Sequence, residues 1–210
     1  MERKSFQPAV VFLDANVLYP AGLRDFLMRL TLQGLYHARW SAPVHEEWMK
    51  AVLRDFPDLT YRQLERTRDL MNRYAVGSLV TGFEHRIEQL SLPDPDDRHV
   101  LAAAIHGKAT VILTRNLKDF PASALTPYGL RAEAPDPFIH ALLTAQPEGV
   151  SATARQHRAN LRNPPKSVED YLASRGLNKD RMYIAGYGSS QPRGDKKASR
   201  RVEIIVLAAG

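Results

Sequence analysis

Cysteine is absent from this chain of 210 residues. Its absence excludes disulfide bonds and thiolate metal sites, and it suits a reducing compartment. Long apolar runs are lacking as well. The run after the first charged residues is too short for a secretion signal, and no later segment reaches the length of a membrane span. The sequence therefore predicts a cytoplasmic protein with no membrane partner.

Positive charge is in modest excess. The chain carries 29 Lys and Arg against 23 Asp and Glu, which gives a formal net charge of +6. Such a balance favours a polyanionic partner such as nucleic acid, although many basic proteins bind none. The hydrophobic share of 44% is ordinary, so we expect one ample core with an appendage.

Short apolar runs alternate with segments of helical period. Strands are predicted at 9–14, 37–41 and 109–114. Helices are predicted at 21–34, 43–56, 60–75 and from 95 onward. This alternation predicts an α/β fold with a mainly parallel sheet between helices, whose functional groups gather at the carboxyl ends of the strands.

Two acids fall at positions where such a sheet would gather functional groups. Asp14 closes the first predicted strand, although an N-capping aspartate is equally common at that junction. Glu47 shares a helical stripe with Val44 and Trp48, whereas Glu46 points elsewhere. A carboxylate on an apolar stripe is costly unless it is paired or binds a cation, so Glu47 is the candidate and a partner arginine is the alternative.

Three aspartates crowd the start of the helix predicted from residue 95. Pro95 suits the first helical position, which makes Asp94 the natural N-cap. Asp96 is most simply a solvated acid that complements the helix dipole. Asp97 occupies the position of a capping-box acid, yet it also shares a stripe with the apolar residues that follow. Asp97 is therefore expected to look inward.

The loop after the strand at 109–114 supplies further polar groups. It carries Asn116 and Asp119, which an Asx-turn loop would explain by itself. Asp119 nevertheless completes a set of acids at strand ends and on inward helix faces. The set is Asp14, Glu47, Asp97 and Asp119. Carboxylates gathered in this way assemble an oxygen-ligand site for Mg²⁺ or Mn²⁺.

Segments 10–20, 40–48 and 92–121 resemble the PIN-domain nucleases, particularly the VapC-like toxins of toxin–antitoxin pairs. The likeness covers roughly residues 8 to 140 and implies a PIN-like nuclease domain at 8–135. The catalytic residues that it implies are Asp14, Glu47, Asp97 and Asp119, supported by Thr114 and Asn116.

The resemblance implies metal-dependent hydrolysis of RNA by a toxin that a cognate antitoxin restrains, usually as a homodimer. Asp14, Asp97 and Asp119 are the expected ligands of Mg²⁺ or Mn²⁺, and Glu47 would orient a water or bind a second ion. Candidates for holding RNA phosphates are Arg24, Arg98 and Arg115, each as readily a surface arginine.

Two other functions stay open from the sequence. A catalytically idle PIN-like fold could bind RNA or a protein partner, and only an assay of cleavage separates it from the nuclease. The first strand and the run ending at Thr114 also resemble motifs of haloacid-dehalogenase-like phosphatases. The sequence does not follow the pattern of these phosphatases. They need a second aspartate two residues after the first, where this chain has Asn16, and an acidic pair after the threonine strand, whereas Asp96 and Asp97 precede Thr114.

The C-terminal third divides into two further parts. Residues 136–176 are expected to form a helical extension, resembling that of one subgroup of these toxins. Residues 177–210 resemble the second half of an OmpA-like domain, with strands predicted at 181–187 and 201–207. Because the first half of that domain and an export signal are missing, peptidoglycan binding is not expected. A small appended sheet, a dimer contact or a recombined C-terminus remain alternatives.

Overall fold

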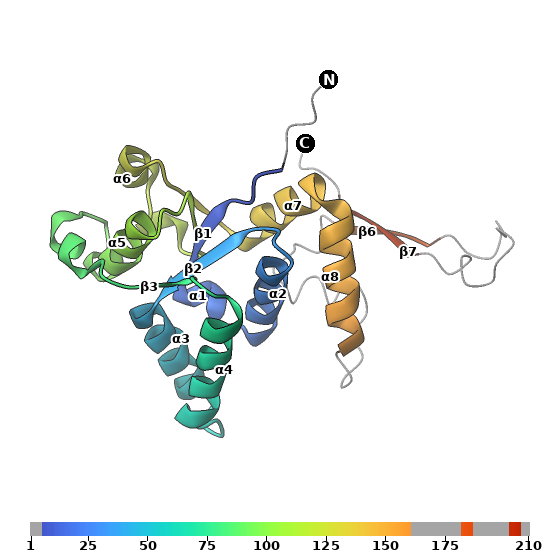
Figure 1. Ribbon diagram of the computed structural model, residues 1–210, viewed down its shortest axis with the longest axis horizontal. Coiled ribbons are helices and arrows are strands. Elements are labelled where there is room, and N and C mark those ends of the chain that lie inside the picture. Colours follow the sequence, from blue (N-terminus) through green and yellow to red (C-terminus); the bar gives the residue numbers. More distant parts are fainter. Residues whose placement is uncertain (1–5, 161–181, 187–201, 207–210) are drawn as a thin grey trace, which may run out of the picture.

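A parallel sheet of five strands lies at the centre of the protein (Figure 1). The computed structural model describes residues 6–160, 182–186 and 202–206. The strand order is β3-β2-β1-β4-β5, and every neighbouring pair is parallel. The strands are β1 (Val10–Leu13), β2 (His37–Ser41), β3 (Leu79–Val80), β4 (Val111–Leu113) and β5 (Arg131–Glu133). The predicted α/β fold with a mainly parallel sheet is confirmed.

Strands β1 and β4 are apolar along their whole length because helices cover both faces of the sheet. Phe12 stands opposite Ile112 of β4 on one side and Arg39 of β2 on the other. Phe12 and Ile112 are fully buried, as is Trp40. Burial of side chains of this size stabilises the fold by about 1.5–3 kcal/mol each.

Helices pack against the sheet from two sides. The longer ones before the C-terminal third are α2 (Ala21–Leu32), α3 (Ala42–Asp55), α4 (Tyr61–Tyr74) and α5 (Arg98–His106). Short turns are α1 (Ala15–Leu18), η1 (Glu84–Gln89), η2 (Pro95–Asp97), η3 (Leu117–Asp119), α6 (Ala122–Leu125) and η4 (Thr126–Tyr128). Helix α5 contacts β1, β2 and β4, and α2 lies on the other side of these strands (Figure 1).

A buried polar network fastens α3 and α4 to β2. Trp48 donates its indole N–H to His45 Nδ1 at 3.0 Å, so the ring proton of His45 is on Nε2, which lies 3.2 Å from Asn72 Oδ1. Trp40 donates to the same amide oxygen at 2.7 Å. Burial lowers the pKa of His45 to about 4, so its imidazole is neutral at pH 7.

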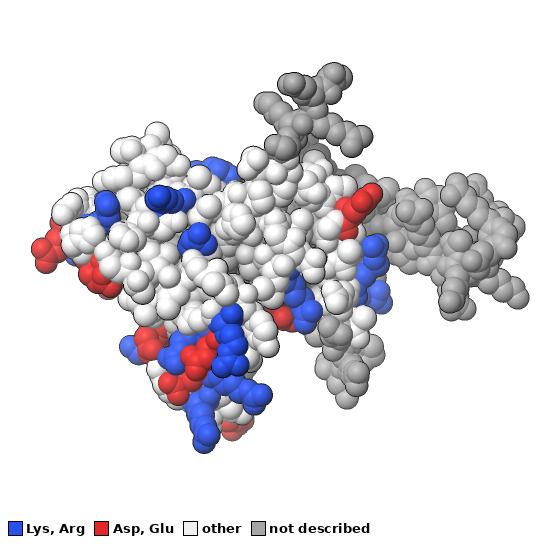
Figure 2. Space-filling model, in the orientation of Figure 1, with Lys and Arg blue, Asp and Glu red and all other residues white. Residues whose placement is uncertain are grey.

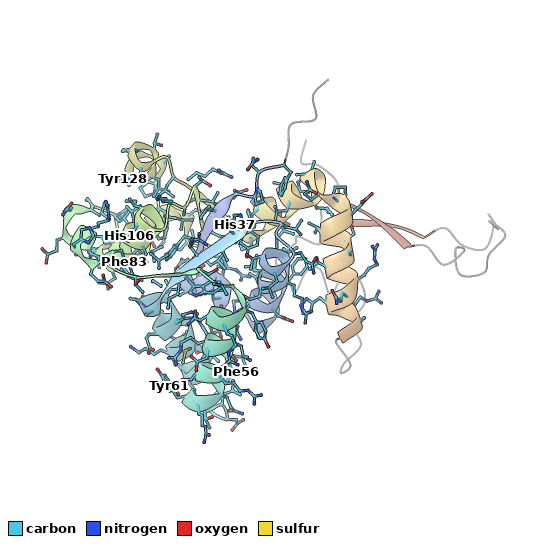
Figure 3. All side chains as sticks on the ribbon, in the orientation of Figure 1. His37, Phe56, Tyr61, Phe83, His106 and Tyr128 are labelled. Carbon is cyan, nitrogen blue, oxygen red and sulfur yellow. The ribbon has the colours of Figure 1, made fainter. Side chains whose placement is uncertain are left out.

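Helices α3 and α4 form a hairpin that carries much of the surface charge. Figure 2 shows the densest group of charged side chains on this face over these two helices. Phe56 and Tyr61 lie at the free end of the hairpin, where both side chains are exposed (Figure 3). Helix α4 begins with a capping box, in which Thr60 and Gln63 satisfy each other's backbone N–H.

Two helices follow the sheet, in the region where the sequence predicts a helical extension. They are α7 (Pro135–Ala145) and α8 (Pro147–Asn160). Phe138 and Leu142 of α7 are buried. On α8 the buried His157 contacts Asp25 of α2 at 2.5 Å and stacks on Phe26, with ring centroids 6.1 Å apart. These contacts hold α8 against α2.

The end of the chain forms two strands where the sequence predicts them. They are β6 (Met182–Gly186) and β7 (Val202–Val206), and they pair antiparallel. The remaining residues of the extension and of the OmpA-like segment, Leu161 among them, lie outside the described residues. In the part of the chain that the structure describes, no helix is both long and apolar enough to cross a membrane.

Candidate active site

Asp14 lies at the carboxyl edge of the sheet, directly after β1 and beside the end of β4. Its backbone N–H donates to the carbonyl of Leu113 at 3.1 Å, so the pairing of β1 with β4 continues up to this residue. Its Oδ1 accepts the backbone N–H of Ala15 at 2.6 Å and caps α1. Asp14 is therefore an N-cap as well as a strand-end acid, and it is only 5% exposed.

Two polar side chains hold the Asp14 carboxylate from below. Thr114, which is fully buried, donates its hydroxyl to Asp14 Oδ2 at 2.7 Å. Asn16 Nδ2 donates to the same oxygen at 2.6 Å and to Thr114 Oγ1 at 2.9 Å. The hydroxyl oxygen also accepts the backbone N–H of Asn116 at 3.0 Å, and Asn16 Oδ1 accepts that of Arg115 at 2.9 Å. The loops after β1 and β4 are thereby joined.

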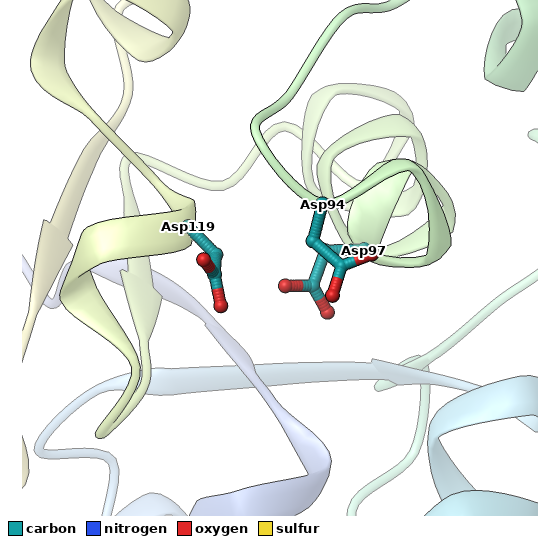
Figure 4. A group of neighbouring side chains, drawn as sticks. All are labelled: Asp94, Asp97 and Asp119. Atoms are coloured by element: carbon teal, nitrogen blue, oxygen red, sulfur yellow. The ribbon is translucent and has the colours of Figure 1, made fainter.

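Three further aspartates converge above this edge (Figure 4). Asp94, Asp97 and Asp119 each offer a carboxylate oxygen, and these atoms lie within 4.8 Å of one another. Asp94 caps η2 by accepting the backbone N–H of Asp96 at 2.9 Å. Asp97 makes no such capping bond, so the capping-box interpretation of this residue is wrong. Asn116 Nδ2 donates to Asp119 Oδ2, which directs the carboxylate from η3.

The acids disturb one another electrostatically. Burial together with the charges of Asp14, Asp94 and Asp119 raises the pKa of Asp97 to about 6. Burial also raises the pKa of Asp14, although the hydrogen bond from Thr114 opposes that rise. Such shifts arise when carboxylates share a site without enough positive charge. Without a cation, the charges in this cluster repel one another.

Glu47 reaches the site from α3 and is held by a histidine of α5. Its Oε1 lies 2.7 Å from His99 Nε2. Burial lowers the pKa of His99, but the hydrogen bond and charge of Glu47 outweigh burial and raise it. The Glu47 side chain is 45% exposed, so it lies at the edge of the apolar stripe rather than in the interior. Glu46 points away from the site and accepts a hydrogen bond from Tyr61 at 3.0 Å.

Arg24 does not fit its predicted contact with phosphate. Its side chain is buried, its Nη1 donates to the carbonyl of Leu18 at 2.6 Å, and its guanidinium lies 4.4 Å from the centre of a Trp48 ring. Burial lowers its pKa to about 10, which still leaves it charged at pH 7. Arg24 is therefore a structural cation that ties α2 to the end of α1 and to α3.

The other two predicted arginines lie near the acids. Arg98 follows Asp97 directly, and its Nε donates to the carbonyl of Pro95 at 2.9 Å, so part of its guanidinium serves the turn. Arg115 is exposed and stands between Thr114 and Asn116 at the rim of the site. Both positions remain compatible with phosphate binding.

Three residues of the site were not selected from the sequence. The sequence pattern indicates only a capping role for Asp94, which Asp94 does fill. The pattern marks Asn16 only as the residue that stands in place of a second aspartate, and it does not select His99. The signals were present: Asn16 follows Asp14 by two residues, as in an Asx turn, and His99 follows Asp97 by two. Neither spacing identifies a partner that lies far away in the sequence.

The donor set suits a hard divalent cation. All three converging groups are carboxylates, which Mg²⁺ and Mn²⁺ prefer as ligands. Among the described residues, this group contains neither a cysteine nor a histidine. Burial is the first cause of the raised pKa of Asp97, and the negative charges of Asp14, Asp94 and Asp119 add to it. A bound cation would offset those negative charges, so the residues present fit such an ion.

Comparison with known proteins gives results for two regions of the chain. Residues 10–118, more than half of the chain, match the family described as PIN domain. Residues 135–174 match the family described as VapC50 C-terminal domain. No solved structure gives a significant match.

A relative from Mycobacterium tuberculosis (strain ATCC 25618 / H37Rv) bears the name "Putative ribonuclease VapC50". It is 58% identical over 43 residues, which cover 20% of this chain and 25% of that protein. The match thus spans a quarter of the relative's length. Together with the two family matches, it supports the resemblance seen in the sequence. The chain belongs to the PIN-domain family, and its residues 135–174 are similar to the C-terminal domain of VapC50.

Proposed function

We propose that this protein is a metal-dependent endoribonuclease that hydrolyses RNA phosphodiester bonds as the toxin of a toxin–antitoxin pair. One observation carries the proposal: the acids of the PIN-family segment converge at the carboxyl edge of its parallel sheet. The name of the mycobacterial relative adds support for RNA as the substrate.

The positions of the acids indicate which of them would bind the metal ion. Asp97, Asp119 and Asp94 offer convergent oxygens, and Asp14 stands close enough to raise the pKa of Asp97, so these four would hold Mg²⁺ or Mn²⁺. When bound, such an ion lowers the pKa of a coordinated water and neutralises charge on the phosphoryl oxygens. Thr114 would keep the Asp14 carboxylate aimed at the site.

Glu47 would serve the attacking water rather than the ion cluster. Its Oε1 is occupied by His99 at 2.7 Å, which leaves Oε2 to accept a proton or orient the water. The carboxylate side chain is half exposed, so water can reach it. Arg98 and Arg115 stand at the rim, where a guanidinium can hold the phosphate next to the scissile bond.

The deciding experiment compares neighbouring aspartates. Purified protein is incubated with total cellular RNA in Mn²⁺ or Mg²⁺ and in EDTA, with Asp97→Asn and Asp96→Asn in parallel. Asp96 is exposed and lies outside the group of three convergent carboxylates, so its substitution is the matched control. We expect cuts that require metal, vanish with Asp97→Asn and persist with Asp96→Asn. Cleavage that survives Asp97→Asn would refute the assignment.

A second candidate is an idle PIN-like module that binds RNA or a protein without cutting. Metal-independent binding of RNA with no cleavage by the wild-type protein would favour it. Membership in the PIN-domain family removes the reason for considering a haloacid-dehalogenase-like phosphatase.

We extend the proposal to organisation and partners. Residues 8–135 would form the nuclease domain, 136–176 the helical extension and 177–210 a separate tail, a division supported by family matches at 10–118 and 135–174. An antitoxin would restrain the enzyme, and the chain would pair as a homodimer. Light scattering of the purified protein measures the last of these, and a monomer would refute it.

A further inference from the structure

One face of α4 carries three exposed arginines in a row. Arg62, Arg66 and Arg73 fall within a sector of about 40° at 100° per residue. They point away from Leu64 and Met71, the buried residues of this helix. The row extends over about 16 Å of helix. We call Arg62, Arg66 and Arg73 the α4 arginine row.

The acids nearest in sequence form their ion pairs with Arg68, although Asp69 lies on the same side of α4 as the row. Glu65 and Asp69 both pair with Arg68, at 3.4 and 3.0 Å, and Glu46 of α3 lies 4.0 Å from the same guanidinium. Arg68 is thus surrounded by three acids, and its side chain leaves α4 on a different side from the arginine row. Within residues 6–160, no ion pair involves a member of the α4 arginine row.

Apolar side chains accompany the three cations. Leu70 is 37% exposed and lies about 40° around the helix from Arg66, and Tyr74 is 63% exposed and lies about 80° from Arg66. Exposed guanidinium groups suit a single-stranded nucleic acid because they bind its phosphates, and an exposed tyrosine ring to one side of them can stack with a base. A purely solvating surface needs no exposed aromatic ring.

The α4 arginine row belongs to the helix that packs on α3, and α3 carries Glu47. Tyr61, at the first position of α4, donates its hydroxyl to Glu46, the sequence neighbour of Glu47. The Asn72 network fixes the other half of α4 to β2 and α3. The helix is therefore held rigidly beside α3, which supplies the site with Glu47.

We propose that the α4 arginine row binds the phosphate backbone of single-stranded RNA outside the site of cleavage. The proposal rests on the proposed function, because it names where the substrate extends beyond the acids. Each guanidinium contacts one phosphate, and the contacts carry no sequence preference. The row adds affinity for long RNA and leaves the chemistry at the acids unchanged.

The test measures binding without cleavage. A fluorescent, unstructured RNA of about 16 nucleotides is titrated in EDTA at several salt concentrations. The test variant combines Arg62→Gln, Arg66→Gln and Arg73→Gln. The control combines Lys108→Gln, Arg131→Gln and Arg155→Gln, which changes the net charge equally on residues of the α5–β4 turn, β5 and α8. Circular dichroism and melting temperature check that both variants fold.

Three lost phosphate contacts lower the slope of log affinity against log salt by about 2, since each contact to a single strand contributes about 0.7. Affinity at about 0.1 M salt then falls by about a hundredfold for the test variant. The control changes both quantities far less. A test variant that binds like the control overturns the proposal, and the row would then be better explained as a docking face for a protein.

Failure here is distinguishable from failure of the proposed function. If wild-type protein cuts RNA in a metal-dependent way but the row variant binds like the control, only the α4 proposal falls. If the row variant loses binding while wild-type protein never cuts, the α4 proposal stands and the nuclease falls. Absence of RNA binding by the wild type overturns the α4 proposal directly.

Discussion

Replacement of Thr114 by valine would remove the hydroxyl on which the loops after β1 and β4 depend. The hydroxyl donates to the Asp14 carboxylate and accepts from Asn16 and from the backbone of Asn116, at 2.7, 2.9 and 3.0 Å. A neutral hydrogen bond is worth about 1 kcal/mol and one to a charged group about 1.5–3 kcal/mol. Asp14 keeps the bonds from Asn16 and Ala15, so the carboxylate is not left unpaired.

We expect Thr114→Val to lower the free energy of unfolding by about 2 kcal/mol. For a chain of this size the melting temperature would fall by about 4–8 °C. Thermal unfolding in EDTA measures the change. Thr144→Val is the control, because its hydroxyl donates only to the carbonyl of His140 on an exposed helix face, and its effect should stay within about 0.5 kcal/mol.

The same substitution has a second readout. The hydrogen bond from Thr114 lowers the pKa of Asp14, so its loss raises that pKa further and makes protons compete better with metal. The substitution should therefore weaken the binding of Mn²⁺ more at about pH 6, where protons compete with the metal, than at about pH 8. A variant that melts within about 1 °C of the wild type would refute the reasoning about this hydroxyl.

Three other predictions concern single residues. Arg24→Met should cost about 2 kcal/mol of stability, because the carbonyl of Leu18 loses its partner, while RNA affinity stays unchanged; weaker RNA binding by a folded variant would contradict the structural role. His99→Leu should reduce cleavage about 10- to 100-fold, and His99→Gln should recover part of it by donating to Glu47; equal rates for both variants would refute the positioning role. As the pH rises from about 4 to about 6, the metal-free protein should become less stable, because Asp97 has a pKa of about 6 in the folded protein against an ordinary 3.8, and its protonated form favours folding. Melting curves in EDTA measure this loss. If Asp97→Asn shows the same loss, Asp97 is not its source.

The fold was predictable where the pattern was strong. The apolar runs at 9–14 and 109–114 indicate β1 and β4, because a strand buried on both faces is apolar throughout. The two outer strands gave no such signal. β3 has two residues, and β5 is Arg131–Glu133, which no apolar run would reveal. Their pairing with the sheet decides their conformation.

The site was predictable in its acids and less so in their partners. Strand ends and helical stripes pointed to Asp14 and Asp97, which the structure brings close enough for one to raise the pKa of the other. The stripe argument placed Glu47 in the interior, whereas its ion pair with His99 holds it at a half-exposed edge. Arg24 was expected at the surface, because neither a Trp48 ring nor the carbonyl of Leu18 can be foreseen as its partner.

The bond between Asn16 and Thr114 spans 98 residues of chain, and that span has a consequence for biosynthesis. The ribosome must synthesise β4 and Thr114 before Asn16, in the loop after β1, can form this hydrogen bond. Pairings between residues so far apart in the chain form late in folding. A nascent chain that has passed only α4 therefore possesses Asp14 and Glu47 but no assembled cluster. The proposed activity against RNA should appear only once the chain through Asp119 has emerged and the central strands have paired.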